Sequence, residues 1–224
     1  MDDKFGMSLS SRVFAVTGGA SGMGAATVQQ LARQGAGAIW IGDWNTSNFE
    51  SLTQEIKGIN PETKVFTQQL DVSKSQEVDA WIDEIMRVSG ALHGAVNCAG
   101  VPQAPPGADV QGKAPSITAA SDEAFHRILS INLYGVFYCT RGQVRAMAKM
   151  PEGSSRAIVN IASLASICHF PGIFAYSTSK AGVAHFTIQV AKDVEPFGIR
   201  CNAISPGKHR KRVPFWHLKG MASR

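Results

Sequence analysis

The sequence predicts an α/β protein with a doubly wound parallel sheet and helices on both faces. Two observations predict it. Short apolar runs alternate along the chain with longer segments of helical periodicity, and a glycine-rich turn follows the first apolar run. Strands and helices that alternate in this way form parallel sheets, because each helix carries the chain back across one face of the sheet.

The expected elements follow one another regularly. The expected strands are residues 13–16, 38–42, 64–70, 94–96, 157–161 and 199–204, and the expected helices are residues 25–34, 47–59, 75–88, 122–150 and 174–194. Residues 101–118, rich in Pro, Gly and Ala, form an expected loop of the kind that often serves function. Asn132 lies among apolar residues of the fourth helix, where its amide needs hydrogen-bond partners.

Length and composition predict one domain over residues 1–224. Apolar residues make up 44% of the chain and charged residues 17%, which is enough to bury a continuous core. The N-terminal residues lack an apolar leader, and no window approaches the ~18 apolar residues of a membrane span. We therefore expect a cytoplasmic protein without a membrane partner. Cys98, Cys139, Cys168 and Cys201 form no C-x-x-C pair, so we expect reduced, buried thiols and no metal site.

The formal net charge of +5 suggests a polyanion as partner until the position of the charge is considered. The last 17 residues, 208–224, carry six Lys or Arg and no acid, which leaves 16 basic against 17 acidic side chains elsewhere. The charge therefore belongs to an atypical basic tail, which is more typical of a solvated terminus than of a nucleic-acid site. We expect no nucleic-acid partner.

A glycine-rich turn separates the first expected strand from the first expected helix. Gly18, Gly22 and Gly24 have the spacing G-x-x-x-G-x-G, with Ser21 and Met23 among them. Glycines let the backbone approach a pyrophosphate, and the N-terminus of the next helix directs free N–H groups at the phosphates. The turn predicts a dinucleotide site, with a structural loop as the alternative.

Asp43 ends the second expected strand, about 20 residues beyond the glycines, where the acid that binds the adenosine ribose belongs. No Lys or Arg lies at positions 17–24 or 44–48, so no nearby cation would receive the 2′-phosphate of NADP, which Asp43 would repel. The pattern favours NAD over NADP. The alternative is an aspartate that only stabilises a turn.

Tyr176 and Lys180 lie four residues apart in the last long helical segment, so their side chains share one face of a helix. A lysine cation beside a phenol favours the phenolate, and such a phenol can exchange protons near neutral pH. The spacing alone is equally compatible with an exposed pair on a helix. The surrounding motifs decide between these interpretations.

Several short motifs occur in a fixed order: the glycine turn, Asn97-Cys98-Ala99-Gly100, Asn132, Ser163, Tyr176-x-x-x-Lys180 and Pro206-Gly207. With this ordered set the chain resembles the short-chain dehydrogenase/reductase family over residues 12–207, and within it the alcohol dehydrogenases of fungal secondary metabolism. The resemblance implies a Rossmann-like fold, a single dinucleotide-binding catalytic domain, and interconversion of an alcohol and a carbonyl compound.

The resemblance also implies roles for individual residues. Tyr176 would be the general base, Lys180 would hold the nicotinamide ribose, Ser163 would bind the substrate oxygen, and Asn132 would hold a water of a proton relay. Asp71 and the Val72 backbone would contact adenine, and residues 97–100 would support the sheet beside the cofactor. The full expected cofactor-binding set is Gly18, Ser21, Gly22, Met23, Gly24, Asp43, Asp71, Val72, Asn97, Ala99, Gly100, Tyr176, Lys180, Pro206 and Gly207.

Two departures from the family pattern stand out. Cys98 replaces the second Asn of an N-N-A-G motif, for which we expect a modest effect. After Pro206-Gly207 the family continues with a threonine that anchors the nicotinamide amide, substrate-covering helices and a seventh strand, whereas this chain continues with residues 208–224. We therefore expect a sheet without its last strand and with the sixth strand at an edge. Family subunits pair through the long helices, which implies a homodimer, and the missing strand argues against a tetramer.

Four residues near the motifs, Ile167, His169, Phe170 and Phe174, predict an apolar pocket for a small-molecule substrate. His169 is expected to contact substrate or solvent rather than to act as a catalyst. The leading hypothesis is an NAD-dependent oxidoreductase acting on a fairly apolar small molecule. The alternative is a truncated member that binds nucleotide or substrate without turnover.

Overall fold

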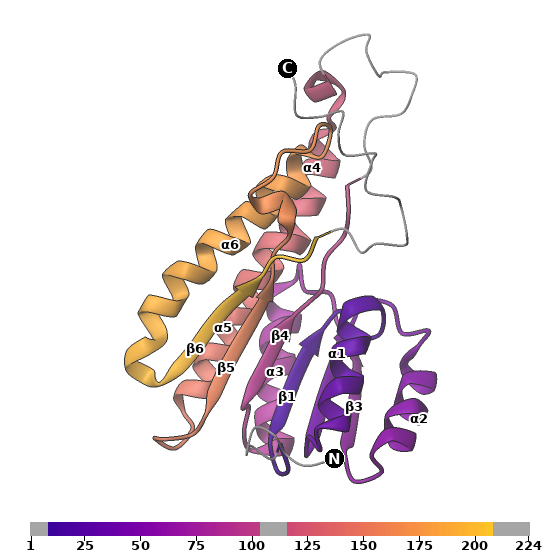
Figure 1. Cartoon of the computed structure of the whole chain (residues 1–224), viewed down its shortest axis with the longest axis vertical. Coiled ribbons are helices and arrows are strands. Elements are labelled where there is room, and N and C mark those ends of the chain that lie inside the picture. Colours follow the sequence, from indigo (N-terminus) through magenta and orange to yellow (C-terminus); the bar gives the residue numbers. More distant parts are fainter. Residues whose placement is uncertain (1–8, 104–115, 208–224) are drawn as a thin grey trace, which may run out of the picture.

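The chain forms one parallel sheet of six strands in the order β3-β2-β1-β4-β5-β6 (Figure 1). The structure is a computed structural model that describes residues 9–103 and 116–207, so the expected basic tail and most of the expected loop over 101–118 lie outside the described residues. Each expected strand is present, with its ends shifted by one residue at most. The strands are β1 (Val13–Thr17), β2 (Ala38–Asp43), β3 (Lys64–Gln69), β4 (Gly94–Asn97), β5 (Arg156–Ile161) and β6 (Ile199–Ile204).

Helices connect the strands and cover both faces of the sheet (Figure 1). The long helices are α1 (Gly22–Arg33), α2 (Phe49–Ile59), α3 (Ser75–Ser89), α4 (Asp122–Leu129), α5 (Gly135–Ala148) and α6 (Phe174–Val194). The prediction of a doubly wound parallel fold is confirmed. The strand order changes direction at β1, which lies between β2 and β4, and ligands of such folds bind at the carboxyl ends of the strands at this point.

Each face of the sheet has its own hydrophobic core. On one face β1 and β2 pack against α1 and α2, with Val28 and Ile56 fully buried. On the other face α3, α5 and α6 pack against the strands, with Trp81 and Met147 fully buried. Burial on both faces holds the parallel strands in register, so their carboxyl ends form one fixed edge.

The prediction of a single helix over residues 122–150 is wrong in the middle of that segment. Between α4 and α5 the chain makes a π-helical turn, Ser130–Tyr134, in which the Gly135 N–H donates to the Ser130 carbonyl. The wider turn includes Asn132, which is fully buried and points its amide at the backbone of Val101. The apolar periodicity of residues 122–150 predicted a continuous α-helix, but the contact of Asn132 with Val101 lies outside that periodicity. Turns of this type occur frequently at functional sites.

The four cysteines are free, as expected, but they are not all buried. Cys139 and Cys201 lie in the core, and burial raises their pKa values to about 12 and about 11. Cys98 is half-buried, and Cys168 is exposed because it lies in the loop after β5. The expectation of buried thiols is therefore wrong for Cys168.

Within residues 9–103 and 116–207, β6 pairs with β5 alone and forms one edge of the sheet. Its last residue, Ile204, is 53% exposed. None of the helices in this described part is long and apolar enough to cross a membrane.

Candidate active site

The three glycines of the predicted turn are each required by the backbone. Gly18 and Gly22 have φ values of +63° and +52°, which favour glycine. A Cβ on Gly18 would lie 2.6 Å from the Cα of Ala99, and a Cβ on Gly24 would overlap the Gly18 carbonyl oxygen. The turn therefore lies directly against the segment after β4 and against the first turn of α1. Its outer surface, including Ser21 and Met23, faces a cavity.

Replacement of Gly24 by alanine is expected to disrupt this packing. The added methyl group must push the two backbone segments apart, so we expect Gly24→Ala to lower the free energy of unfolding by about 2 kcal/mol or more. Gly58 is the matched control, because it is exposed on α2 and a Cβ there meets nothing within 4 Å. Gly58→Ala should raise stability by up to about 1 kcal/mol. Urea denaturation measures both, and equal stabilities would contradict the packing described.

The carboxylate of Asp43 connects the glycine turn to the end of β2. Its Oδ2 accepts the N–H of Ala20 at 3.0 Å, and its Oδ1 accepts the N–H of Asn45 at 3.0 Å. Asp43 therefore stabilises a turn, as its alternative interpretation stated, and it also lines the cavity beside the glycines. The turn contacts do not exclude ribose binding, since each carboxylate oxygen has a further lone pair for a ligand hydroxyl.

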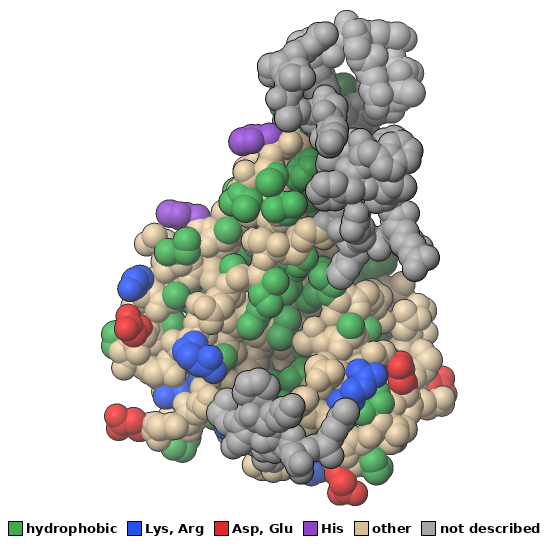
Figure 2. Space-filling model, in the orientation of Figure 1, with side chains coloured by type: hydrophobic (Ala, Val, Ile, Leu, Met, Phe, Trp, Pro, Cys, Tyr) green, Lys and Arg blue, Asp and Glu red, His purple; other side chains and the backbone are tan. Residues whose placement is uncertain are grey.

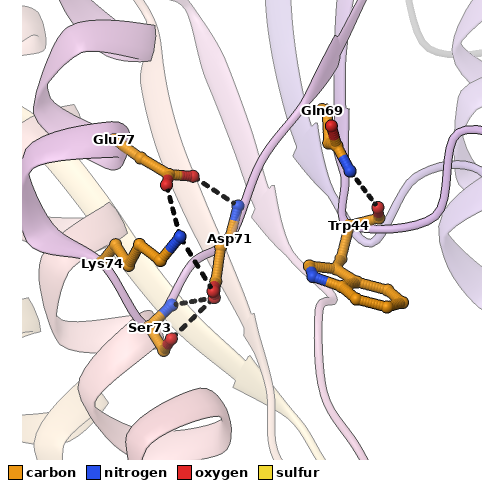
Figure 3. Close-up of polar contacts among 6 residues, drawn as sticks. All are labelled: Trp44, Gln69, Asp71, Ser73, Lys74 and Glu77. Carbon is orange, nitrogen blue, oxygen red and sulfur yellow. Dashed lines mark hydrogen bonds and ion pairs between the residues drawn. The ribbon is translucent and has the colours of Figure 1, made fainter.

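A first cavity of about 670 Å³ extends along the carboxyl ends of β1, β2 and β3. Asp71 and Val72 line it at the end of β3, and Figure 3 shows Asp71 held there by its own turn. Its Oδ1 accepts the N–H of Ser73 at 3.0 Å and the hydroxyl of Ser73 at 2.6 Å. The indole of Trp44, next to Asp43, is 70% exposed and lines the same cavity.

A second cavity of about 620 Å³ continues from the first toward β5 and α6. The two cavities share a set of lining residues, so together they form one cleft across the carboxyl edge of the sheet; these are Gly22, Met23, Cys98, Gly100 and Val101. The second cavity brings together five residues that the sequence singled out: Ser163, Tyr176, Lys180, Pro206 and Gly207. Figure 2 shows hydrophobic side chains gathered near the carboxyl ends of β5 and β6.

Lys180 is buried beneath this second cavity. Only 5% of the residue is exposed, and its Nζ donates to the carbonyl of Ile161 at 2.7 Å. Burial lowers the pKa of Lys180 to about 8, and the neighbouring sulfur of Cys98 opposes the shift. The Nζ lies 5.9 Å from the centre of the Tyr176 ring, so the two side chains share one face of α6 as the spacing predicted.

Asn132 borders the same region from the π-helical turn. Its Nδ2 donates to the carbonyl of Val101 at 3.0 Å and to the hydroxyl of Ser179 at 3.3 Å, and its Oδ1 accepts the Val101 N–H at 2.8 Å. A Cβ built on Gly100 would lie 3.2 Å from Asn132 Oδ1 and 3.5 Å from Lys180 Nζ. The amide and the ammonium therefore border one small space beside Gly100. The amide has the partners that its apolar surroundings require.

Ser163 lies just after the carboxyl end of β5. Its backbone is extended, and its Oγ accepts the N–H of Ala165 at 3.2 Å at the start of a 3-10 turn over Leu164–Ser166. The hydroxyl hydrogen remains available to a group in the cavity, because an oxygen that accepts one bond can still donate another. A phenol, a serine hydroxyl and a buried ammonium in one cleft can move a proton to or from a bound oxygen and stabilise its charge.

Asn97 lines neither part of the cleft and lies behind it in a buried polar network. Its Nδ2 donates to Oδ1 of Asn160 at 2.8 Å, and Oδ1 of Asn97 accepts from Nε2 of Gln143 at 2.8 Å. Asn160 in turn donates to the hydroxyl of Thr187 on α6 at 3.0 Å. The network joins β4, β5, α5 and α6, and sequence reasoning identified only its first member.

The loop after β5 contributes fewer residues to the cleft than expected. Phe170 lines the second cavity, and Phe174 lines a neighbouring cavity of about 270 Å³. Ile167 and His169 line neither of these cavities, and both are exposed. Arg127 of α4 lines the first cavity although it lies far from the glycine turn in sequence. No signal in the sequence around Arg127 would have identified it, because α4 comes close to the first cavity only in the folded chain.

Known proteins match the chain over most of its length. The family model described as short chain dehydrogenase matches residues 12–212. The chanoclavine-I dehydrogenase of Arthroderma otae is 51% identical over 202 residues, which are 89% of this chain and 75% of that protein. The chanoclavine-I dehydrogenase of Penicillium roqueforti is 48% identical over 200 residues, with the same two shares.

Solved structures agree with these sequence matches. The structure of NAD⁺-bound xylitol dehydrogenase has a TM-score of 0.79 and 29% identity over 90% of this chain and 72% of that chain. The structure of levodione reductase has a TM-score of 0.78 and 30% identity over 88% of this chain and 72% of that chain.

Proposed function

Because the chain belongs to the short-chain dehydrogenase family, whose reactions convert CH–OH groups, we propose that it interconverts an alcohol and a carbonyl compound with NAD on a fairly apolar small molecule. Membership confirms the resemblance expected from the ordered motifs. The observation that carries the proposal is the cleft, in which Tyr176, Lys180 and Ser163 share one cavity with the glycine turn.

The residues of the cleft fit a nicotinamide dinucleotide. A Cβ built on Gly22 would meet nothing within 4 Å, and Gly22 lines the first cavity, so the turn has open space there for a pyrophosphate. Asp43 offers carboxylate oxygens for a ribose at the end of β2. When bound, the nicotinamide ring accepts or supplies the hydride. Arg127 also lines the first cavity and is a second candidate contact for the phosphates.

The chain's own residues handle the proton. We assign to Tyr176 the transfer of the proton at the substrate oxygen, and to Ser163 the hydrogen bond that stabilises charge on that oxygen. Lys180 would support the phenolate, since its buried ammonium lies one turn along α6 from the phenol, and it would hold the nicotinamide ribose of a bound cofactor. We assign to Asn132 the binding of a water that would connect Lys180 to solvent, because the Asn132 amide and the Lys180 ammonium both lie near Gly100.

We propose NAD rather than NADP because the carboxylate of Asp43, which lines the first cavity beside the glycine turn, would repel the 2′-phosphate of NADP. Its carboxylate is fixed by two backbone N–H groups and cannot turn away without breaking both bonds. Titration of the full chain with NADH and NADPH, followed by nucleotide fluorescence, should show tighter binding of NADH. Asp43→Ser should reduce the difference in affinity between NADH and NADPH. Equal binding of both nucleotides by the unchanged chain would contradict the assignment of NAD as the cofactor.

The substrate is proposed to be apolar because the catalytic end of the cleft is lined mostly by apolar side chains, among them Pro102, Leu164, Phe170 and Ile173. Several relatives are named chanoclavine-I dehydrogenase, so chanoclavine-I, a secondary metabolite, is the first compound to test as a substrate. Incubation with NAD and a panel of alcohols, followed by absorbance of the reduced nicotinamide, tests the reaction. Tight NADH binding without turnover on any alcohol or ketone would favour a non-redox role instead.

We also propose a homodimer formed through the outer faces of α5 and α6. Phe137 and Ile188 are 40% and 60% exposed on these two helices, and Tyr134 at the start of α5 is 49% exposed. Phe137 packs edge-on against Phe186 at 6.0 Å between ring centroids, which joins the two exposed faces into one. Light scattering on the full chain checks this, and a monomer would contradict it. We do not propose a tetramer.

A further inference from the structure

The helix that bears Tyr176 and Lys180 begins without a cap from its own sequence. The residue before α6 is Ile173, whose side chain accepts no hydrogen bond. Pro171 and Gly172 precede it, so the local sequence offers no Ser, Thr, Asp or Asn as a substitute. Tyr176 is the third residue of α6, and the N–H groups of the first helical turn have no partner inside the helix. A partner must come from elsewhere in the fold.

Gln103 is that partner. Its Oε1 accepts the backbone N–H of Tyr176 at 3.1 Å, across 73 residues of sequence. Gln103 comes from the segment after β4, and it lines the cavity of about 270 Å³ together with Gly172 and Phe174 from the start of α6. The side-chain amide therefore replaces the missing N-cap of the helix.

The other end of the same segment is held by Asn132. The N–H and carbonyl of Val101 bond to the two ends of the Asn132 amide, at 2.8 Å and 3.0 Å. Pro102, whose ring restricts its backbone, lies between Val101 and Gln103 and lines both the catalytic cavity and its smaller neighbour. We call Val101-Pro102-Gln103 the strap, because it joins Asn132 at one end to the backbone of Tyr176 at the other.

We propose that Gln103 is a positioning residue that holds Tyr176 in place by capping α6, an inference that rests on the proposed proton transfer by Tyr176. Lys180 lies one turn deeper and is held independently by the Ile161 carbonyl. If the first helical turn opens, the phenol moves while the ammonium does not, and the two separate. Helix ends fray readily, and a misplacement of about 1 Å at a reacting group can lower a rate about a hundredfold.

Two variants of the full chain separate capping from other effects. Gln103→Met keeps the shape of the side chain and removes the acceptor. We expect kcat to fall about ten- to a hundredfold with NADH affinity unchanged. Hydrogen exchange of the peptide that contains the Tyr176 amide should become about two- to tenfold faster, since one hydrogen bond contributes about 0.5–1.5 kcal/mol. Gln29→Met is the matched control, because among the described residues Gln29 bonds to Glu55 between α1 and α2 and lines neither part of the cleft. Its turnover should not change.

Gln103→Glu keeps an acceptor and adds a charge near the phenol. Exchange at Tyr176 should stay slow, while the pH at which alcohol oxidation reaches half its maximum rate should rise by about half a unit, because a negative charge disfavours the phenolate. If Gln103→Met does not fold, an unshifted profile for Gln103→Glu overturns the inference.

Other outcomes are equally decisive. If hydrogen exchange at the Tyr176 amide is unchanged in Gln103→Met, Gln103 does not cap α6. If exchange becomes faster in Gln103→Met while kcat is unchanged, Gln103 caps α6 but does not position Tyr176 for the reaction. Full turnover by Tyr176→Phe would remove the proposed function itself, while the exchange result would still report whether Gln103 caps the helix.

Discussion

Tyr176→Phe is expected to lower turnover about a hundred- to ten-thousandfold, the range that loss of a general acid–base group produces. The change removes one oxygen from a half-buried side chain and leaves the ring in the wall of the catalytic cavity. Binding of NADH should therefore persist. Steady-state oxidation of an accepted alcohol measures the loss, and fluorescence titration measures the binding.

Tyr138→Phe is the matched control, because it deletes the same oxygen from a half-buried tyrosine of α5 that lines neither part of the cleft. It should retain full turnover. A Tyr176→Phe variant as active as this control would show that the proton leaves the substrate by another route.

Lys180→Met is expected to abolish turnover and to change how stability depends on pH. The pKa of Lys180 is about 8 in the folded chain against 10.5 for a free side chain. Below pH 8 the folded chain must bury an ammonium, which destabilises it. Between about pH 8 and 10.5 the folded chain loses this proton while the unfolded chain keeps it, so stability rises with pH. The difference between the two pKa values corresponds to a rise of about 3 kcal/mol in the free energy of unfolding, at about 1.36 kcal/mol per pKa unit.

The measurement is a difference between two proteins. Urea denaturation of the unchanged chain and of Lys180→Met, each without nucleotide, gives the free energy of unfolding at pH 7 and at pH 10.5. The free energy of unfolding of Lys180→Met minus that of the unchanged chain should be about 3 kcal/mol larger at pH 7 than at pH 10.5. The buried thiols Cys139 and Cys201 ionise on unfolding in both proteins, so their contribution cancels.

Lys192→Met is the control for this experiment. Lys192 is exposed in the last turn of the same helix, so its ammonium stays in water before and after unfolding. A pH-dependent difference of the same size in Lys192→Met would show that the effect does not come from burial at position 180.

The strands, the glycine turn and the Tyr176–Lys180 pair could be predicted because their signals are local. A strand of a two-sided parallel sheet is a short apolar run, and the glycines are needed by backbone angles and close contacts within one turn. The four-residue spacing on α6 needs nothing beyond helix geometry. The order of these motifs along the chain also indicates the family, and it needs no knowledge of contacts in the fold.

Other features depend on segments that meet only in the folded chain. The π-helical turn forms where Asn132 meets Val101. Gln103 contacts α6 across 73 residues, and Arg127 reaches the first cavity from α4. No pattern within a short window contains such contacts.

The π-helical turn also separates two helices that would otherwise have to change together. In a continuous helix each residue adds about 100° of rotation, so any insertion or deletion turns every later side chain to a new direction. Here the wider turn lets α4 set its own orientation beside the cleft while α5 keeps Cys139, Ala146 and Met147 in the core. A change in α4, whose Arg127 lines the first cavity, therefore need not turn the residues of α5 that pack against the sheet. An extra residue at this point is thus absorbed by the wider turn, and the side chains of α5 keep their direction toward the core.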